Sequence, residues 1–206
     1  VNSGAGVGCM AKNNIIEEYG SYTFNDFSNF DKNIDLAGNK WLFLYLTQSL
    51  DKKTMASFEV ADIKNRTGKI SLNLNLSTIN TLEFINFEQY IKGQGQSIII
   101  EVQPIDMLNN MRTFVNVKER LHKAGHDILL DATSIEMLQT LNIKSLGFDY
   151  VKLFWHDLME EYNYESEDIK KLFEEIGVNK IILAKCLGEN AIRWGSSLRV
   201  KDGEVA

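Results

Sequence analysis

The amino-acid sequence predicts an α/β fold: a TIM-like β/α barrel whose N-terminal edge need not be complete. Three observations predict this fold. Short apolar runs alternate at least five times with amphipathic segments of about 10 to 15 residues, as in parallel βαβ units. No Pro/Gly/Ser-rich linker divides the chain, so residues 1–206 are expected to form a single domain. Polar residues end four of the strand-like runs, at Asn75, Glu101, Asp131 and Lys152.

Strands are expected where a short apolar run lies between turn residues or alternates with polar residues. The clearest case begins at Lys69, where Ile70, Leu72 and Leu74 alternate with polar side chains. Three consecutive isoleucines before Glu101 predict a buried strand. In chain order, the expected strands cover residues 7–11, 69–76, 97–102, 127–131, 150–153 and 180–184.

Helices are expected where apolar residues recur at helical spacing. The helix expected at 36–49 has a wide apolar face that includes Trp41, Leu44 and Tyr45. Gly125 is expected to end a helix, because glycine readily adopts the left-handed conformation found after helix ends. In chain order, the expected helices cover residues 24–31, 36–49, 82–91, 107–123, 135–141, 167–176 and 189–197.

The composition predicts a packed domain without a nucleic-acid partner. Apolar residues make up 44% of the chain, and a net charge of −6 argues against binding to phosphate backbones. Cys9 and Cys186 form neither a disulfide framework nor a metal knuckle, so a reduced cytoplasmic setting is expected. The longest apolar run, 41–46, is too short for direct membrane insertion. Because the chain begins at Val1, we expect a fragment of a longer protein, with any tether upstream.

Short motifs follow the strand-like runs in a definite order. Asp131 and Lys152 lie 21 residues apart (152 − 131), and Asn75 begins the triplet Asn-Leu-Ser. In order and spacing these motifs resemble EAL domains, the cyclic-di-GMP phosphodiesterase family. Residues 101–104, 130–134, 150–154 and 182–188 fall where that family has Glu-Leu-Thr-Glu, Leu-Asp-Asp-Phe-Gly, Lys-Ile-Asp after an apolar pair, and Val-Ala-Glu-Gly-Val-Glu.

Two further stretches contribute to the resemblance. Residues 8–12 occupy the place of the name-giving Glu-x-Leu-x-Arg strand. Residues 147–158 look most like the diverged EAL domains of alphaproteobacterial flagellar-assembly receptors. The resemblance therefore covers most of the chain, although no single motif is intact.

The resemblance implies a hydrolytic site with two divalent cations held by carboxylates. Three of the first-metal positions match, at Asn75, Glu101 and Asp131. The other acidic positions of the family are filled here by Gly8, Ala132, Phe154, Lys185 and Gly188. A two-metal mechanism cannot operate on this residue set, so we expect a degenerate domain that is not an enzyme and needs no cofactor. The alternative is an active phosphodiesterase with an atypical ligand set, which would need Mg²⁺ or Mn²⁺.

Ligand binding can survive the loss of the metals. The ammonium groups of Lys12, Lys152 and Lys185 are available to the phosphates of cyclic di-GMP. Glu101 and Asp131 can accept hydrogen bonds from guanine or ribose, or they can repel the phosphates. With Asn75, these residues form the candidate ligand site. The competing hypothesis is a barrel that only docks a protein partner or a second copy of itself, with Tyr162 and Tyr164 as candidate anchors.

Structural explanations compete with the functional ones at the same residues. Asn75 is equally suited to a turn, and Asp131 to capping the next helix. A salt bridge to Lys152 would account for Glu101 without any ligand. A third hypothesis is an unrelated barrel enzyme in which Glu101 or Asp131 acts as general base beside Lys152.

Overall fold

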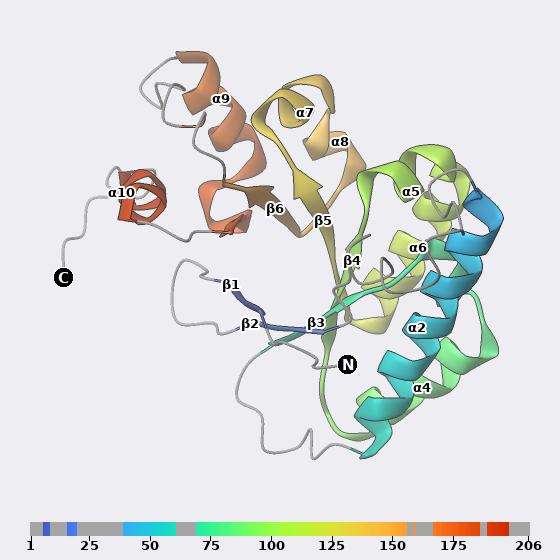
Figure 1. Ribbon diagram of the computed structural model, residues 1–206. Helices are drawn as coiled ribbons and strands as arrows, with labels where there is room; N and C mark the ends of the chain where they lie inside the picture. The colour runs from blue at the N-terminus through green and yellow to red at the C-terminus, as the bar shows by residue number, and fades with distance from the viewer. Residues whose placement is uncertain are drawn as a thin grey trace.

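A computed structural model of the protein describes residues 6–8, 16–19, 39–60, 69–155, 159, 167–185 and 189–197. Their strands form one sheet in which the order follows the sequence (Figure 1). The first two strands are antiparallel, and each later neighbour is parallel. The strands are β1 (Gly6–Gly8), β2 (Ile16–Tyr19), β3 (Lys69–Asn73), β4 (Ile98–Val102), β5 (Asp127–Thr133), β6 (Tyr150–Phe154) and β7 (Ile181–Ala184).

The sheet curls, with its helices on the outer side. Figure 1 shows the strands turning progressively from β3 to β6. β1 comes close to β7, although the two are the first and last strands of the sheet. The helices are α2 (Lys40–Val60), α3 (Leu76–Ile79), α4 (Leu82–Gly93), α5 (Pro104–Asn109), α6 (Met111–Ala124), α7 (Ile135–Thr140), α8 (Ile143–Leu146), α9 (Glu167–Ile176) and α10 (Glu189–Ser197), with a 3-10 helix η3 (Val178–Lys180). The predicted α/β class is confirmed, with a curled parallel sheet.

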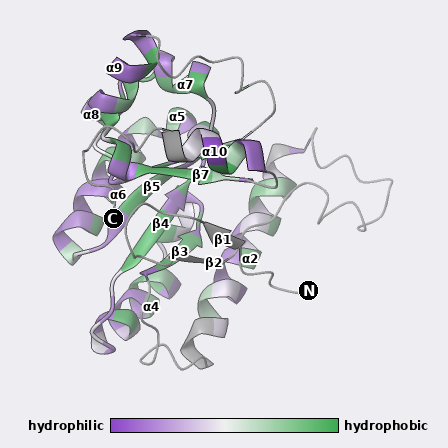
Figure 2. Ribbon diagram, turned by 90° about the vertical axis from the view of Figure 1, so that its left-hand side faces the viewer, coloured by the Kyte–Doolittle hydropathy of each residue, from purple (hydrophilic) through white to green (hydrophobic). Residues whose placement is uncertain are grey.

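The outer face of the sheet carries the main hydrophobic core. Residues such as Ile70, Ile100 and Leu130 pack there against helix residues that include Phe84 and Phe114. Figure 2 shows the hydrophobic strands β4 and β5 surrounded by helices that carry hydrophilic stretches. Within the described ranges, no helix combines the length and the apolar content that a membrane crossing requires.

The inner face of the sheet carries a separate, smaller apolar cluster. Ile99, Leu129 and Ile182 are fully or almost fully buried there, with Tyr150 packed against them. In the parallel register, Glu101 lies beside Leu129 and Lys152 beside Ile182. Because paired residues of neighbouring strands share a face, Glu101 and Lys152 lie on the inner face with this cluster.

The expected strand at 69–76 ends early, at Asn73. The backbone N–H of Asn75 bonds to the carboxylate of Asp51, and that of Leu76 bonds to Asp106. These side chains satisfy backbone groups that a longer strand would have paired with a neighbour, and α3 begins at Leu76.

The helix expected at 107–123 is two helices. α5 begins earlier, with Pro104 in its first turn, where a missing N–H costs no helical hydrogen bond. Asn110 leaves the helical conformation, with φ −132° and ψ 39°, and separates α5 from α6. Gly125 ends α6 in the left-handed conformation, as predicted.

Other helix predictions differ in length or lie outside the described residues. The helix expected at 36–49 is α2, which runs from Lys40 to Val60, and the carboxamide of Asn39 accepts from the backbone N–H of Leu42 at its start. α8 was not predicted. The expected α9 and α10 have the predicted bounds. The helix expected at 24–31 lies outside the described residues.

The first strand of the parallel sheet corrects the sequence analysis. The strand expected at 7–11 is described only as β1, which is antiparallel to β2. The parallel neighbour of β3 is β2, which had not been predicted and which contains Glu17 and Glu18. Gly8 therefore lies in the antiparallel strand β1 and not in the parallel strand beside β3. Two consecutive glutamates in β2 hide the apolar alternation by which strands are recognised.

Candidate functional site

Two carboxylates and one ammonium meet on the inner face, where β4, β5 and β6 approach their carboxyl ends. Glu101 comes from β4, Asp131 from β5 and Lys152 from β6. Their exposed fractions are only 1%, 5% and 5%. Charged side chains are rarely buried unless they are paired, so this cluster requires internal compensation.

Lys152 supplies the compensating charge. Its Nζ forms an ion pair with Oε2 of Glu101, and it lies 3.4 Å from Oδ1 of Asp131. The hydroxyl of Thr133 donates to the carbonyl oxygen of Lys152 at 2.9 Å and ties β5 to β6 beside the cluster. The salt bridge considered for Glu101 from the sequence is therefore present, and Lys152 reaches a second carboxylate as well.

Three neutral side chains hold the two carboxylates. The hydroxyl of Ser71 donates to Oε1 of Glu101, and Nδ2 of Asn73 donates to Oε2 at 3.1 Å. Nε2 of Gln103 donates to Oδ2 of Asp131 at 2.6 Å. Oδ1 of Asp131 is buried and has no hydrogen-bond donor within the described part of the chain. Both carboxylates are thus fixed in position, and one buried acceptor remains.

Asn75 has other hydrogen-bond partners than this cluster. Its side chain donates to Oδ2 of Asp51 on α2 at 2.8 Å, and the Thr78 hydroxyl donates to the same oxygen at 2.6 Å. Asn75 occupies the N-cap position of α3, although its side chain makes no capping hydrogen bond. Asn75 therefore organises the loop after β3, as expected from the hypothesis that it is a turn residue.

Lys185 and Phe154 form a separate contact at the same rim. The ammonium of Lys185 lies 4.2 Å from the centroid of the Phe154 ring, and the Lys185 side chain is exposed. Phe154 follows Lys152 by two residues on β6, so the two share a face of the sheet. Lys185 is therefore a solvent-facing cation beside the buried cluster. Lys12, the third predicted cation, lies outside the described residues.

The arrangement does not fit a divalent cation. Such an ion needs carboxylate oxygens that are free to coordinate it, yet those of Glu101 already accept from Ser71, Asn73 and Lys152. Ala132 supplies no ligand atom from its side chain. Among the described residues, no group of three or more His, Cys, Asp or Glu side chains is placed to hold a metal ion.

Asp131 does not cap the following helix. The hydroxyl of Ser134 accepts from the backbone N–H of Met137 at 3.3 Å and caps α7 instead. Ser71, Asn73 and Gln103 were not singled out from the sequence. Ser71 and Asn73 alternate along β3 and thus share one face, which was the signal available for them.

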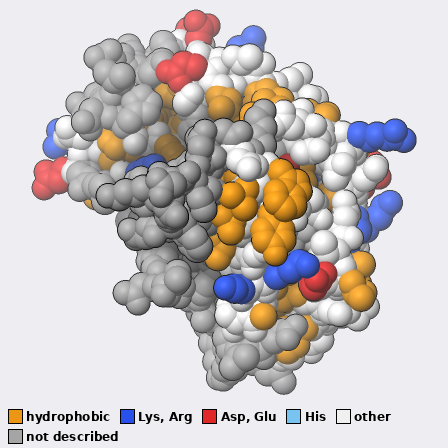
Figure 3. All heavy atoms as spheres, turned by 45° about the vertical axis from the view of Figure 1, so that its right-hand side comes forward, with side chains coloured by type: hydrophobic (Ala, Val, Ile, Leu, Met, Phe, Trp, Pro, Cys, Tyr) orange, Lys and Arg blue, Asp and Glu red, His pale blue; other side chains and the backbone are white. Residues whose placement is uncertain are grey.

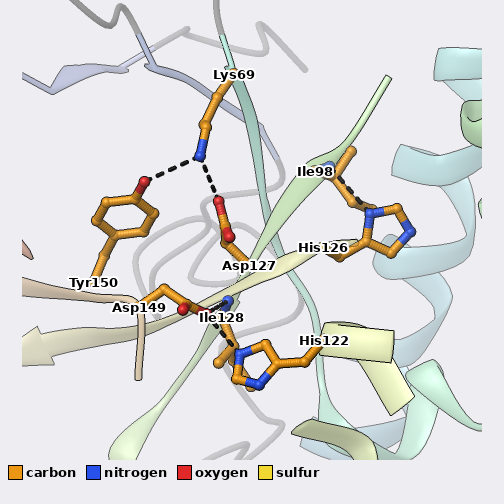
Figure 4. Close-up of polar contacts among 8 residues, drawn as sticks. All are labelled: Lys69, Ile98, His122, His126, Asp127, Ile128, Asp149 and Tyr150. Carbon is orange, nitrogen blue, oxygen red and sulfur yellow. Dashed lines mark hydrogen bonds and ion pairs between the residues drawn. The ribbon is translucent and has the colours of Figure 1, made fainter. Parts of the chain in front are cut away.

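A second polar cluster fills the opposite, amino end of the inner face (Figure 4). Nζ of Lys69 lies 2.5 Å from Oδ2 of Asp127 and 3.0 Å from the hydroxyl of Tyr150. Burial lowers the pKa of Lys69, but its hydrogen bonds to Asp127 and Tyr150 outweigh burial and leave the pKa raised. This pairing joins β3, β5 and β6 and involves one carboxylate only.

No protein-family model matches this sequence, and neither does any of the curated proteins compared with it. Several solved structures match this chain, among them two complexes with c-di-GMP. The Vibrio cholerae LapD S helix-GGDEF-EAL structure, bound to c-di-GMP, is 14% identical over 95% of this chain, with a TM-score of 0.53. The chain spans about half of that structure, 50% of its length. A PaMucR phosphodiesterase complex with c-di-GMP is 12% identical over 86% of this chain and 87% of its own, with a TM-score of 0.43. The likeness to LapD establishes a shared architecture, so the chain is EAL-like in fold.

Proposed function

We propose that the chain is a non-catalytic EAL-like module, closed as a TIM-like barrel, that binds cyclic di-GMP without a metal ion. One observation carries the proposal: the Lys152 ammonium contacts both carboxylates, Glu101 and Asp131, that a first metal would need. Ala132 and Lys185 stand where the resemblance calls for the acids of a second metal. The shared fold with a c-di-GMP-bound protein supports the choice of ligand.

The charges of the cluster and of Lys185 indicate which groups of cyclic di-GMP each would contact. Among the described residues the cluster contains two carboxylates and one ammonium, and the Glu101 carboxylate disfavours a phosphate directly beside it. The exposed Lys185 ammonium is the better partner for a phosphate, as a charge-assisted donor. The carboxylates then face groups that donate hydrogen bonds, such as guanine N–H or ribose hydroxyls.

Calorimetry with cyclic di-GMP, in EDTA and in Mg²⁺, tests the proposal together with a chromatographic assay for hydrolysis. We expect equal affinity in both buffers and no product. Hydrolysis in Mg²⁺ that is lost in Glu101→Gln would show an active phosphodiesterase with an atypical ligand set. Absence of binding in both buffers would refute the proposal that the chain is a cyclic-di-GMP receptor. Protein docking would then remain as the competing function.

Lys185→Ala tests the position of the phosphate. Removing one charge-assisted hydrogen bond should weaken cyclic di-GMP binding about tenfold, or about 1.4 kcal/mol. Lys180→Ala is the matched control, because Lys180 is an exposed lysine that precedes the amino end of the same strand, β7. Calorimetry should show unchanged affinity for this control. Equal loss in both variants would indicate a general charge effect and not a contact at the rim.

A second candidate function, self-association, is favoured by the surface of α2. Trp41, Leu44 and Tyr45 are exposed by 72%, 40% and 56%, and the two aromatic rings stack with centroids 5.7 Å apart. Figure 3 shows hydrophobic side chains gathered on this side of the molecule. An aromatic side chain buries about 150–250 Å² in full, and a twofold interface counts each residue twice. The patch would supply a sizeable share of the roughly 1,200 Å² that a specific dimer needs.

Sedimentation equilibrium tests whether a second copy covers this surface. Trp41→Glu should weaken the dimer at least tenfold, because an aromatic anchor is replaced by a charge. Ile192→Glu on α10 is the matched control, since the Ile192 side chain is also largely exposed, at 63%, but lies on another helix. A wild-type chain that remains monomeric at about 1 mM would exclude the dimer. Its Kd for self-association would then lie above about 1 mM, which corresponds to a binding free energy weaker than roughly 4 kcal/mol.

A further inference from the structure

We infer that α6 is a docking surface for a second copy of this chain, which packs its own α6 antiparallel against it about a twofold axis at Val115. This surface is separate from the exposed patch on α2, because α3, which contacts both helices, lies between them. A dimer formed through α6 does not depend on a bound nucleotide. Exposed apolar side chains and a pair of opposite charges support it.

Exposed apolar side chains concentrate on α5 and the first half of α6. Ile105 and Leu108 are three residues apart on α5, and Met111 and Val115 are four apart on α6, so each pair shares one side of its helix. The exposed fractions of these four residues are 65%, 50%, 38% and 41% in chain order. A concentration of exposed apolar side chains marks an interaction site, whereas single exposed residues are ordinary.

Opposite charges lie before and after Val115 along α6. Arg112 is three residues before Val115 (115 − 112), and Glu119 is four residues after it (119 − 115), so all three lie on one side of the helix. Both charged side chains are exposed, and within the described ranges neither has an ion-pair or hydrogen-bond partner. At about 1.5 Å per residue, Arg112 lies about 4.5 Å before Val115 and Glu119 about 6 Å after it.

This charge pattern is complementary to itself when the helix is reversed. In an antiparallel pair with the twofold axis at Val115, Arg112 of each copy faces Glu119 of the other, because the two lie at nearly equal distances on opposite sides of the axis. A parallel pair would place Arg112 beside Arg112 and Glu119 beside Glu119. Like charges in contact oppose association, so the pattern selects the antiparallel orientation.

Other basic residues of α6 are used within the domain and hold the helix in place. Nζ of Lys118 donates to the carbonyl oxygen of Leu146 on α8 at 2.6 Å, and Nη2 of Arg120 donates to the carbonyl oxygen of Ile79 on α3 at 2.9 Å. These contacts fix α6 against the elements on both of its sides. A surface that is fixed before it binds loses little conformational entropy on association.

The size of this surface predicts a weak dimer. A twofold axis uses each side chain twice, so every apolar residue of α5 and α6 contributes to both halves of the contact. Stable specific interfaces bury at least about 1,200 Å², and smaller ones belong to weak or transient complexes. A contact centred on one helix of 14 residues lies near this lower limit. We therefore expect a dissociation constant in the micromolar range.

Charge reversal on α6 tests the antiparallel dimer. Arg112→Glu and Glu119→Arg are each made in a Trp41→Glu parent, so that the α2 contact is removed and self-association reports on α6. Either reversal should weaken the dimer at least tenfold by sedimentation equilibrium, because it turns two symmetry-related attractions into repulsions. The two reversed variants mixed together should form a mixed dimer about as tight as that of the parent. Native mass spectrometry identifies this mixed dimer by its mass.

The remaining variants separate a charge contact from damage to the helix. The double variant Arg112→Glu, Glu119→Arg should self-associate as tightly as the parent. Lys171→Glu and Glu175→Arg on α9 are the matched controls, because both side chains are exposed on another helix, and neither should change the dimer. A Trp41→Glu parent that stays monomeric at about 1 mM overturns the inference. Undiminished self-association of either single reversal, or failure of the two to pair with each other, also overturns it.

Discussion

Ala132 and Lys185 adopt the left-handed backbone conformation, with φ values of 50° and 61°. No other non-glycine residue in the described ranges has a positive φ. Ala132 lies where the pairing of β5 with β6 shifts register, and Lys185 directly follows β7. Left-handed backbone costs an L-residue about 1–2 kcal/mol and tends to occur at functional sites. Both residues border the cluster around Lys152, so the backbone strain lies at the candidate site.

Ala132→Gly should stabilise the protein. Glycine adopts a positive φ without the steric cost, and part of that gain is offset by its greater freedom in the unfolded chain. We expect the free energy of unfolding to rise by about 0.5–1 kcal/mol in urea titrations. Ala124→Gly, at the end of α6, should lower it by a similar amount, because helical backbone favours alanine. The same sign for both variants would contradict this account.

His126 should make stability depend on pH. Its Nδ1 accepts from the backbone N–H of Ile98 at 3.3 Å, and its side chain is almost fully buried. Burial lowers the pKa of His126, and the nearby Glu88 carboxylate only partly opposes this. The unfolded chain therefore binds a proton more readily as pH falls through about 6.5, so stability falls with it, by at most about 1.4 kcal/mol per pH unit.

Urea titrations at pH 7.5 and 5.5 measure this effect. His126→Gln should reduce the loss of stability between the two pH values. His122→Gln is the control, because His122 is 38% exposed beside Asp149 (Figure 4), and the loss should persist in it. A wild-type protein equally stable at both pH values would rule out the effect.

Residues directly at strand ends were predictable from the sequence, and those past the ends were not. Glu101 and Lys152 lie in strands whose bounds follow from apolar runs, so their meeting on the inner face follows from strand order. Asn75 appeared equivalent, but β3 ends two residues earlier, and the Asp51 carboxylate on α2 binds it. No local pattern reveals a hydrogen bond that spans 24 positions in the chain.

Among the elements, the loops after β3 and β4 are joined to each other by side chains. One carboxylate oxygen of Asp106 on α5 accepts from the backbone N–H of Leu76, and the other accepts from Asn110. Asp51 joins the same loop to α2. These contacts divide α5 from α6 and shorten β3, which explains why apolar spacing alone misplaced both boundaries.

Gly125→Ala should destabilise α6. Gly125 has φ 83°, and its backbone N–H bonds to the carbonyl oxygens of Leu121 and His122. A side chain there is strained although no atom lies within 4 Å of the added Cβ. We expect a loss of about 1 kcal/mol by thermal or urea unfolding. Gly93→Ala, at the end of α4 and equally open, should instead gain about 0.5 kcal/mol.

Across the whole molecule, the sequence predicted the parallel sheet but not its first strand. The isoleucine and leucine runs of β3 to β7 are recognisable, because both faces of these strands are buried. β2 has two adjacent glutamates and is identified only by its pairing with β3. Pairing between segments about 50 residues apart (69 − 16 = 53) leaves no trace in local composition.

Ligand binding should stabilise the whole fold if the proposed function is correct. Cyclic di-GMP at 100 times its Kd should raise the free energy of unfolding by about 2.7 kcal/mol, which corresponds to a Tm shift of about 5–10 °C in a chain of this size. The shift should be the same in EDTA and in Mg²⁺, because Lys152 already compensates Glu101 and Asp131. A shift that requires Mg²⁺ would point to metal-mediated binding. Differential scanning fluorimetry measures both conditions.

The apolar layer of Ile99, Leu129 and Ile182 separates the two ionic groups inside the curl. Lys69, Asp127 and Tyr150 form one group at the amino ends of β3, β5 and β6. Glu101, Asp131 and Lys152 form the other group near the carboxyl ends of β4, β5 and β6. Substitutions at one end of the inner face can therefore accumulate, or be engineered, with little electrostatic effect on the other end. The end of the inner face that holds Lys69 is therefore a second place where a new binding site could be engineered. The end that holds Lys152 would remain unchanged.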